Sequence, residues 1–207
     1  MRVFIVYAHP SEDSFTRQIR DSFIRGLESA GHDYILSDLY QMRFKTDMSE
    51  DEYLREAYYR NEIPVPPDVI AEQEKINASD AIVFIFPLFW SDAPAKLVGW
   101  FDRVWTYGFA YGENRTMKRL EKGLILCSAG NTIEYFHRTG ILGVLEKMML
   151  EDRLFDRVQT KELVILDGTS RETPLREKNW KTHLERAFQA GAQIRAAGHT
   201  STCGRPD

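Results

Sequence analysis

The chain has 207 residues, of which 43% are apolar and 12% aromatic; this is enough for one large globular domain or two small ones and excludes a disordered protein. Its formal net charge of −4, without a basic tract, disfavours nucleic acid and anionic membrane surfaces as partners. No window approaches the roughly 20 apolar residues of a membrane span. The two cysteines give neither a disulfide framework nor a metal-binding spacing, so we expect a reducing, cytoplasmic setting.

Short apolar runs rich in Val, Ile and Phe predict the β-strands. They lack polar alternation, which is typical of parallel strands covered on both faces. The first run lies in MRVFIVYAHP and predicts a strand, not a signal peptide, because it is short and no small-residue cleavage site follows. The predicted strands are residues 3–8, 34–36 (the weakest), 81–86, 123–127 and 163–166.

Amphipathic patterns between these runs predict the helices. They cover residues 14–29, 68–77, 96–105, 133–150 and 175–197, with a short helix at 49–59 inside a charged and aromatic excursion at 41–67. The alternation predicts one α/β domain, a flavodoxin-like doubly wound five-stranded parallel sheet in the order 2-1-3-4-5 with helices on both faces. The domain is expected to span residues 1–197, and residues 198–207 are expected to form a flexible tail. No GxGxxG follows the first strand, which argues against a Rossmann domain.

In such sheets ligands bind outside the carboxyl ends of the strands, beside the first strand. The loop there reads HPSEDSFT and leads into a helix, whose free N–H groups suit a phosphate or pyrophosphate. Its side-chain donors are His9, Ser11, Ser14 and Thr16. Simple helix capping by Ser11, Asp13 or Ser14 is an equally good interpretation. Glu12 and Asp13 oppose an anion unless they face away.

The loop after the third strand, FPLFWSDAPA, carries an unusual amount of apolar surface. Leu88, Phe89 and Trp90 are costly to expose unless they cover a flat apolar ligand. The alternative is that Phe89 and Trp90 fold back into the core. We expect Asp92 to cap the next helix, with Pro94 in its first turn.

The loop after the fourth strand, CSAGNT, has small residues that let a ligand approach the backbone closely. It opens a helix, so its N–H groups can stabilise developing negative charge. Tyr135 and His137 follow and are candidate catalytic residues, although such residues are more often structural. No GxSxG, HExxH or metal-spaced Cys/His cluster occurs, and no metal is expected. Cys127 is expected in the core and Cys203 in the tail, and His32, His183 and His199 are interpreted as surface residues.

Four segments together resemble a known family. They are YAHPSEDSFT, SDLYQMRF, DVIAEQEKINASDAIVFIFPLFW and APAKLVGWFDRVWTYGFAY, which cover residues 1–111 well. They are similar to the flavodoxin-like NAD(P)H:quinone oxidoreductases of the DT-diaphorase type, and the combination of FPLFW, LVGWFDRV and GFAY is specific. The resemblance implies a flavin at the carboxyl end of the sheet. Asp102 and the length of the 41–67 excursion favour FAD, with FMN as the alternative.

The resemblance also implies the cofactor-binding residues. Those for the phosphates and the ribityl chain are His9, Ser14, Phe15 and Thr16, with Ser11 as a further donor. Those that wrap the isoalloxazine ring are Pro87, Leu88, Phe89 and Trp90. Those at its pyrimidine edge are Ser128, Ala129 and Gly130, with Asn131 beside them.

Other implied roles lie further from the phosphates. Tyr135 matches a tyrosine near the flavin and the hydride acceptor. Asp102 matches an acidic residue that in the family touches the adenine end of FAD. Tyr111 matches an aromatic that reaches the partner's active site, since the family works as homodimers; Trp90 and Tyr111 are therefore expected on the substrate side. The sequence departs from the family at Ala129, where glycine is common, and at Phe89, where glutamine is frequent. His137 lies too close to Tyr135 to match the family histidine.

The predicted function is that of a two-electron reductase that passes hydride from NAD(P)H through the flavin to a quinone or a related acceptor. The flavin would carry the chemistry, and the protein would supply position and electrostatics. Alternatives are an ancillary regulatory subunit of a potassium efflux system, an azo or nitroaromatic reductase, and a flavodoxin-like electron carrier. The last is disfavoured by the larger chain and the quinone-reductase motifs.

Overall fold

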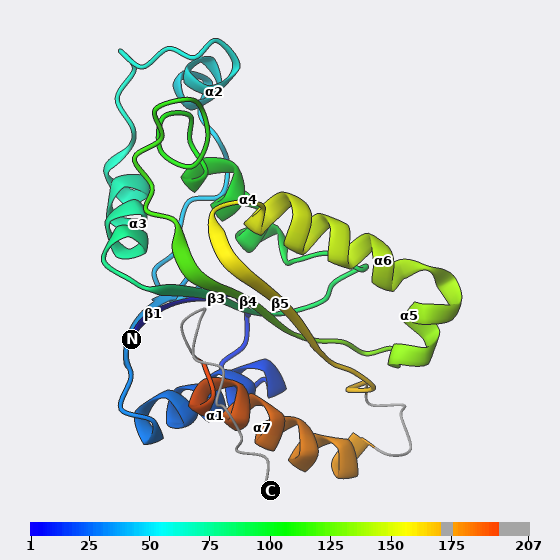
Figure 1. The fold of residues 1–207 in the computed structure, drawn as a ribbon. Helices are drawn as coiled ribbons and strands as arrows, with labels where there is room; N and C mark the ends of the chain where they lie inside the picture. Colours follow the sequence, from blue (N-terminus) through cyan, green and yellow to red (C-terminus); the bar gives the residue numbers. More distant parts are fainter. Residues whose placement is uncertain (171–175, 195–207) are drawn as a thin grey trace, which may run out of the picture.

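A parallel sheet of five strands forms the centre of the molecule (Figure 1). The computed structural model describes residues 1–170 and 176–194. The strands lie in the order β2-β1-β3-β4-β5, which confirms the predicted fold class and strand order. Their bounds are β1 Arg2–Tyr7, β2 Asp33–Asp38, β3 Ala81–Pro87, β4 Leu120–Ser128 and β5 Val158–Leu166.

The edge strands are longer than the apolar runs that predict them. β5 begins at buried Val158, continues through exposed or partly buried residues, and ends in buried Ile165 and Leu166. Among the described strands it pairs only with β4, so its other edge is open to solvent. Such an edge strand does not need a continuous apolar run. β3, at the centre of the sheet, is buried at every residue.

Helices cover both faces of the sheet (Figure 1). The face with α1 (Phe15–Ser29) and α7 (Arg176–Ala192) packs on the side chains of Val3, Ile5, Val83 and Ile85. The opposite face carries α3 (Pro67–Asn77), α4 (Ala95–Val104) and the segment after β4, around a core that contains Trp100, Phe84 and Phe101.

The two helices on the first face touch through glycines. A Cβ on Gly26 of α1 would lie 2.1 Å from the carbonyl oxygen of Phe188, and one on Gly191 of α7 would lie 2.2 Å from that of Phe23. Both distances are far below contact, so the backbones approach as closely as they do only because neither position has a side chain. This packing holds the C-terminal half of α7 against the C-terminal half of α1.

The helical segment after β4 is not the single helix predicted for residues 133–150. It consists of α5 (Ile133–Thr139), α6 (Ile141–Glu146) and wider π-helical turns, η1 (Lys147–Leu154). The break falls at Gly140, which caps α5 with a φ of 75°. Glycine adopts this left-handed conformation without steric cost.

The excursion between β2 and β3 is folded back on the sheet by charge. Its helix α2 (Glu50–Ala57) begins with a capping box between Ser49 and Glu52. Arg103 of α4 is buried and donates to Glu52 at 2.6 Å, to both carboxylate oxygens of Asp68 at 2.6 and 3.0 Å, and to the carbonyl of Lys45 at 2.8 Å. One guanidinium thus ties the excursion, α3 and α4 together.

Three remaining expectations concern single residues. Cys127 is buried in the core, as predicted. His183 is not a surface residue: only 5% of it is exposed, because α7 turns it toward the loop after β5. His199, Cys203 and the predicted tail at 198–207 lie outside the described residues. Among residues 1–170 and 176–194, no helix is both long and apolar enough to cross a membrane.

Candidate functional site

The loops after β1, β3 and β4 meet at the carboxyl edge of the sheet, as the strand order requires. Ser128, the last residue of β4, joins all three. Its carbonyl accepts from the N–H of Leu88 at 2.8 Å, and its hydroxyl lies 3.0 Å from the hydroxyl of Thr16. Both hydroxyls are buried. The predicted loops therefore form one connected surface.

The loop after β1 ends in the start of α1. Ser14 is the N-cap and accepts from the N–H of Arg17 at 3.0 Å, so the capping interpretation of this serine is correct. Capping leaves the N–H groups of Phe15 and Thr16 without intrahelical partners, because the first helical N–H groups precede any acceptor. The first turn of α1 contains no acidic residue. An anion is therefore compatible with this helix start even though Ser14 caps it.

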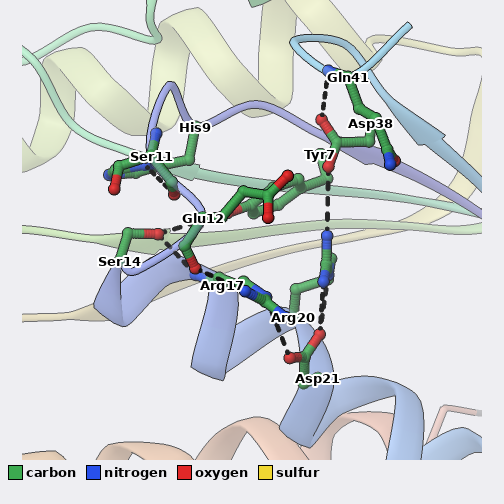
Figure 2. Close-up of polar contacts among 10 residues, drawn as sticks. All are labelled: Tyr7, His9, Ser11, Glu12, Ser14, Arg17, Arg20, Asp21, Asp38 and Gln41. Carbon is green, nitrogen blue, oxygen red and sulfur yellow. Dashed lines mark hydrogen bonds and ion pairs between the residues drawn. The ribbon is translucent and has the colours of Figure 1, made fainter.

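His9 precedes this helix and is braced by its own loop. Its Nδ1 lies 3.0 Å from both the N–H and the carbonyl oxygen of Ser11 (Figure 2). The tautomer that accepts from the Ser11 N–H carries its proton on Nε2, and this is the form that can donate to a phosphate from Nε2. Burial lowers the pKa of His9, which keeps the imidazole neutral near pH 7. Its expected contribution to phosphate binding is then a hydrogen bond from Nε2, not a positive charge.

A cavity of about 270 Å³ opens beside this loop, between the ends of β1 and β2. Arg20 lines this cavity, and Figure 2 shows it between the carboxylates of Asp38 and Asp21. The Arg20 guanidinium also lies 4.6 Å from the centre of the Tyr7 ring. Sequence reasoning missed Tyr7, Arg20 and Asp38, although the segment SDLY, which begins in the last two residues of β2, was a signal. Glu12 lines this cavity and not the start of α1.

The loop after β3 is a tight reverse turn. Phe89 and Asp92 pair through two backbone hydrogen bonds of 2.9 and 3.0 Å, and the residues between them, Trp90 and Ser91, have φ values of 54° and 65°. Phe89 is 44% exposed and Trp90 is 102% exposed. The alternative that they fold back into the core is therefore wrong, and both rings stand out from the carboxyl edge.

Asp92 does not cap α4. The N-cap is Pro94, without a side-chain hydrogen bond, and the Asp92 carboxylate accepts instead from the adjacent N–H of Ala93 at 2.6 Å. The backbone pairing of Asp92 with Phe89 decides this geometry, because it turns Asp92 into the second leg of the hairpin. Pro87 ends β3 as a buried residue, and Leu88 packs partly against the core.

The loop after β4 runs from buried to exposed. Ser128 and Ala129 are buried, whereas Gly130 and Asn131 are exposed. The N–H of Ala129 donates to the carbonyl of Leu166 at 2.9 Å and so extends the sheet. Of the amides expected to face a ligand, that of Ala129 is thus already used, and those of Gly130 and Asn131 are the better candidates.

The two predicted catalytic residues lie on α5. Tyr135 is half-buried, and the Arg138 guanidinium lies 5.8 Å from the centre of its ring. His137 is exposed, in the last turn of the helix. Tyr135 is thus closer to the 128–131 loop in sequence and in the helix than His137.

Asp102 and Tyr111 lie apart from these loops within the chain. The Asp102 side chain is 55% exposed on α4, with Arg153 at 4.0 Å. The Tyr111 hydroxyl donates to Glu56 of α2 at 2.8 Å, in the green loop at the end of the sheet where β4 begins (Figure 1). Burial raises the Tyr111 pKa, and the hydrogen bond to Glu56 raises it further. Their predicted roles require contact with a second copy or an extended cofactor.

The donors and surfaces at the carboxyl edge fit the parts of a flavin nucleotide. The α1 start offers N–H groups, hydroxyls and a neutral imidazole, which suit a phosphate. The exposed pair Phe89 and Trp90 suits a planar ring, and the exposed backbone at Gly130 has no side chain to block its edge. These are the residues that could hold the cofactor.

Comparisons with known proteins give the class of this chain. The family model described as "Flavodoxin-like fold" matches residues 1–187, so the chain belongs to the flavodoxin-like family. Within it, the NAD(P)H:quinone oxidoreductase from Methanothermobacter marburgensis superimposes with a TM-score of 0.87 at 45% identity, over 93% of this chain and 96% of that one.

Two curated relatives are similar over shorter stretches. The ribosyldihydronicotinamide dehydrogenase-like protein traD of Penicillium crustosum is 31% identical over 72% of this chain, and the rat NAD(P)H dehydrogenase [quinone] 1 is 35% identical over 53%. The matched region spans 65% and 45% of those relatives. They carry further sequence that this match does not include.

Proposed function

We propose that this chain is a flavin-dependent reductase that transfers hydride from NAD(P)H to a quinone-like acceptor. The observation that carries the proposal is the strained turn at residues 89–92, which presents two exposed aromatic rings at the edge where the α1 start and the small-residue loop meet. The 45% identity to a quinone oxidoreductase over nearly the whole chain supports it.

A bound flavin would supply the chemistry of accepting and donating a hydride. The residues of this chain would place it. The N–H groups of Phe15 and Thr16 and the Nε2 of His9 would donate to its phosphates. Phe89 and Trp90 would cover the ring and exclude water from one side of it.

Two further groups would act on charge and protons. The N–H groups of Gly130 and Asn131 would donate to the ring edge where negative charge develops. The Tyr135 hydroxyl would hold a hydrogen bond to the oxygen of the acceptor. His137, exposed at the far end of α5, is the weaker candidate for a proton role.

The finer points of the proposal are FAD as the cofactor, a cytoplasmic homodimer as the working form, and a site at its interface. Trp90 supports the dimer, because its indole is 102% exposed and no part of residues 1–170 and 176–194 covers it. Tyr111 supports it as well, since its loop lies at the opposite end of the sheet from the 128–131 loop and could reach only a partner's site.

The test is the cofactor itself. The protein purified from its expression host is denatured, and the released flavin is identified by mass. We expect a yellow protein that releases FAD, and a mass that corresponds to FMN would correct the cofactor without removing the function. A colourless protein that binds neither added FAD nor added FMN would contradict the proposal.

A further inference from the structure

The loop after β5 holds the loop after β4 by hydrogen bonds that no motif in the sequence announces. Both the N–H and the hydroxyl of Thr169 donate to the carbonyl of Ala129, each at 2.9 Å. The N–H of Gly168 donates to the carbonyl of Asn131 at 3.0 Å. The two accepting carbonyls, of buried Ala129 and exposed Asn131, flank Gly130 in the candidate flavin site, so the β5 loop sets the direction of that backbone.

Asp167, at the start of the same loop, fixes the next step of the chain. Its carboxylate accepts from the N–H of Ile133 at 2.8 Å, the first residue of α5. The two residues are 34 positions apart in sequence. This bond comes in addition to the helix cap, in which the Thr132 hydroxyl accepts from the N–H of Tyr135. The short helix that carries Tyr135 is therefore oriented from outside as well as by its own cap.

His183 of α7 stands behind Asp167. Its Nε2 lies 2.8 Å from the Asp167 carbonyl, which can only accept, so Nε2 carries the ring proton. Its Nδ1 lies 3.5 Å from an Arg186 nitrogen, which can only donate. Burial lowers the pKa of His183, and the positive charge of Arg186 lowers it further. Contacts on both sides of the ring thus favour one neutral tautomer.

Besides these bonds, the loop is held by the Ala129 N–H, which donates to Leu166, and by the small buried side chain of Ala129. Ala129 and Gly130 bring almost no side chain, and a Cβ on Gly130 would meet only the Ser170 Cβ, at an ordinary 3.5 Å. Side-chain packing cannot position such a backbone, so hydrogen bonds from a neighbour must. The β5 loop supplies them and is itself anchored on α7, which packs on α1.

We propose that Asp167 and Thr169, backed by His183, are positioning residues that hold the 129–133 backbone in the geometry needed to bind the flavin ring edge. They act through Ala129, Asn131 and Ile133 and do not themselves touch the cofactor. The proposal rests on the flavin function proposed above. It adds a set of hydrogen bonds that couples the α7 face of the molecule to the site.

The test compares Asp167→Ala with Asp167→Asn, which keeps an acceptor oxygen for the Ile133 N–H. Amide hydrogen exchange of the 129–136 region is measured on the flavin-free protein. Flavin affinity is measured separately by quenching of flavin fluorescence, together with the visible spectrum of the bound flavin. For Asp167→Ala we expect about tenfold faster exchange and about tenfold weaker flavin binding with an altered spectrum. Asp167→Asn is expected to keep most of the slow exchange, the flavin affinity and the flavin spectrum of the wild type.

Thr169→Val removes the hydrogen bond from the Thr169 hydroxyl and keeps a side chain of similar size, so it replaces Asp167→Ala as the test if that variant does not fold. We expect it, too, to make amide exchange faster and flavin binding weaker. Unchanged exchange and unchanged flavin affinity in the folded variants would overturn the proposal, as would an effect in Asp167→Asn as large as in Asp167→Ala. A wild-type protein that binds no flavin would refute the proposed function instead, and the exchange measurement would still decide whether these residues hold the loop.

Discussion

At the scale of single residues, the turn at Trp90 and Ser91 stores strain at the edge of the site. A non-glycine residue in the left-handed region costs about 1–3 kcal/mol, and the exposed indole gains no burial against the described part of the chain to offset it. Strain kept without local benefit is typical of a functional position. The benefit, by our account, comes when the ring of a flavin covers the indole.

Glycine at this turn should separate strain from function. We expect Ser91→Gly and Trp90→Gly each to raise the free energy of unfolding of the flavin-free protein by about 1 kcal/mol, since glycine adopts a positive φ without cost. Urea unfolding measures this. Only Trp90→Gly is expected to weaken flavin binding, by about tenfold or more, because it also removes the indole.

Trp90→Ala is the matched control, because it loses the indole but keeps the strained Cβ. It should lose flavin affinity without gaining stability. Equal flavin affinity in wild type and Trp90→Ala would remove the indole from the site.

Tyr135 offers a test of the proton role. Tyr135→Phe removes one hydroxyl from a half-buried ring and leaves its packing in place. We expect flavin content to stay unchanged while kcat for quinone reduction falls about tenfold, because the hydrogen bond to the acceptor is lost. His137→Gln is the comparison on the same helix and should have little effect. Unchanged turnover in Tyr135→Phe would exclude the hydroxyl from the mechanism.

At the scale of elements, the contact between α1 and α7 depends on missing side chains. Gly26→Ala would place a Cβ 2.1 Å from the Phe188 oxygen and must push the helices apart. We expect it to lower the free energy of unfolding by about 3 kcal/mol. Gly143→Ala in the exposed part of α6 meets no atom within 4 Å and should raise it by about 0.5–1 kcal/mol. Similar effects at both positions would contradict this account of the packing.

Arg103 holds the excursion through two carboxylates, and this makes a pH prediction. The hydrogen bond from Arg103 lowers the pKa of Asp68. Burial raises the pKa of Glu52, but hydrogen bonds from Ser49 and Arg103 outweigh it, and the net pKa is lowered. Carboxyl groups with a lowered folded pKa stabilise the fold above their unfolded pKa, about 4, and this contribution is lost as the pH falls through the folded pKa.

Arg103→Met should therefore cost about 3–5 kcal/mol at pH 7, mostly because the Glu52 side chain, 8% exposed, is left charged without its partner. The cost should shrink below about pH 4, where the carboxylates become neutral. Urea unfolding of wild type and variant at both pH values measures the difference. A cost that does not change with pH would show that packing, not charge, holds the excursion.

At the scale of the whole molecule, much of the fold could be predicted because buried parallel strands leave continuous apolar runs, and strand order then places the loops. Three features could not. The break at Gly140 has no signal, since an isolated glycine is tolerated in a helical pattern. The failure of Asp92 to cap α4 has no signal either, because it results from backbone pairing with Phe89, which does not depend on residue type. The Asp167–His183 contact joins segments 16 positions apart through a carbonyl, which any residue has.

The central claim is that one site receives hydride from NAD(P)H and passes it to a quinone. An anaerobic titration of the flavin-loaded protein tests it most directly, with the visible absorbance of the oxidised flavin as the signal. We expect one equivalent of NADPH or NADH to bleach the flavin and one equivalent of a quinone to restore the absorbance fully. A flavin that neither nicotinamide reduces, or that stays reduced when the quinone is added, would contradict the claim.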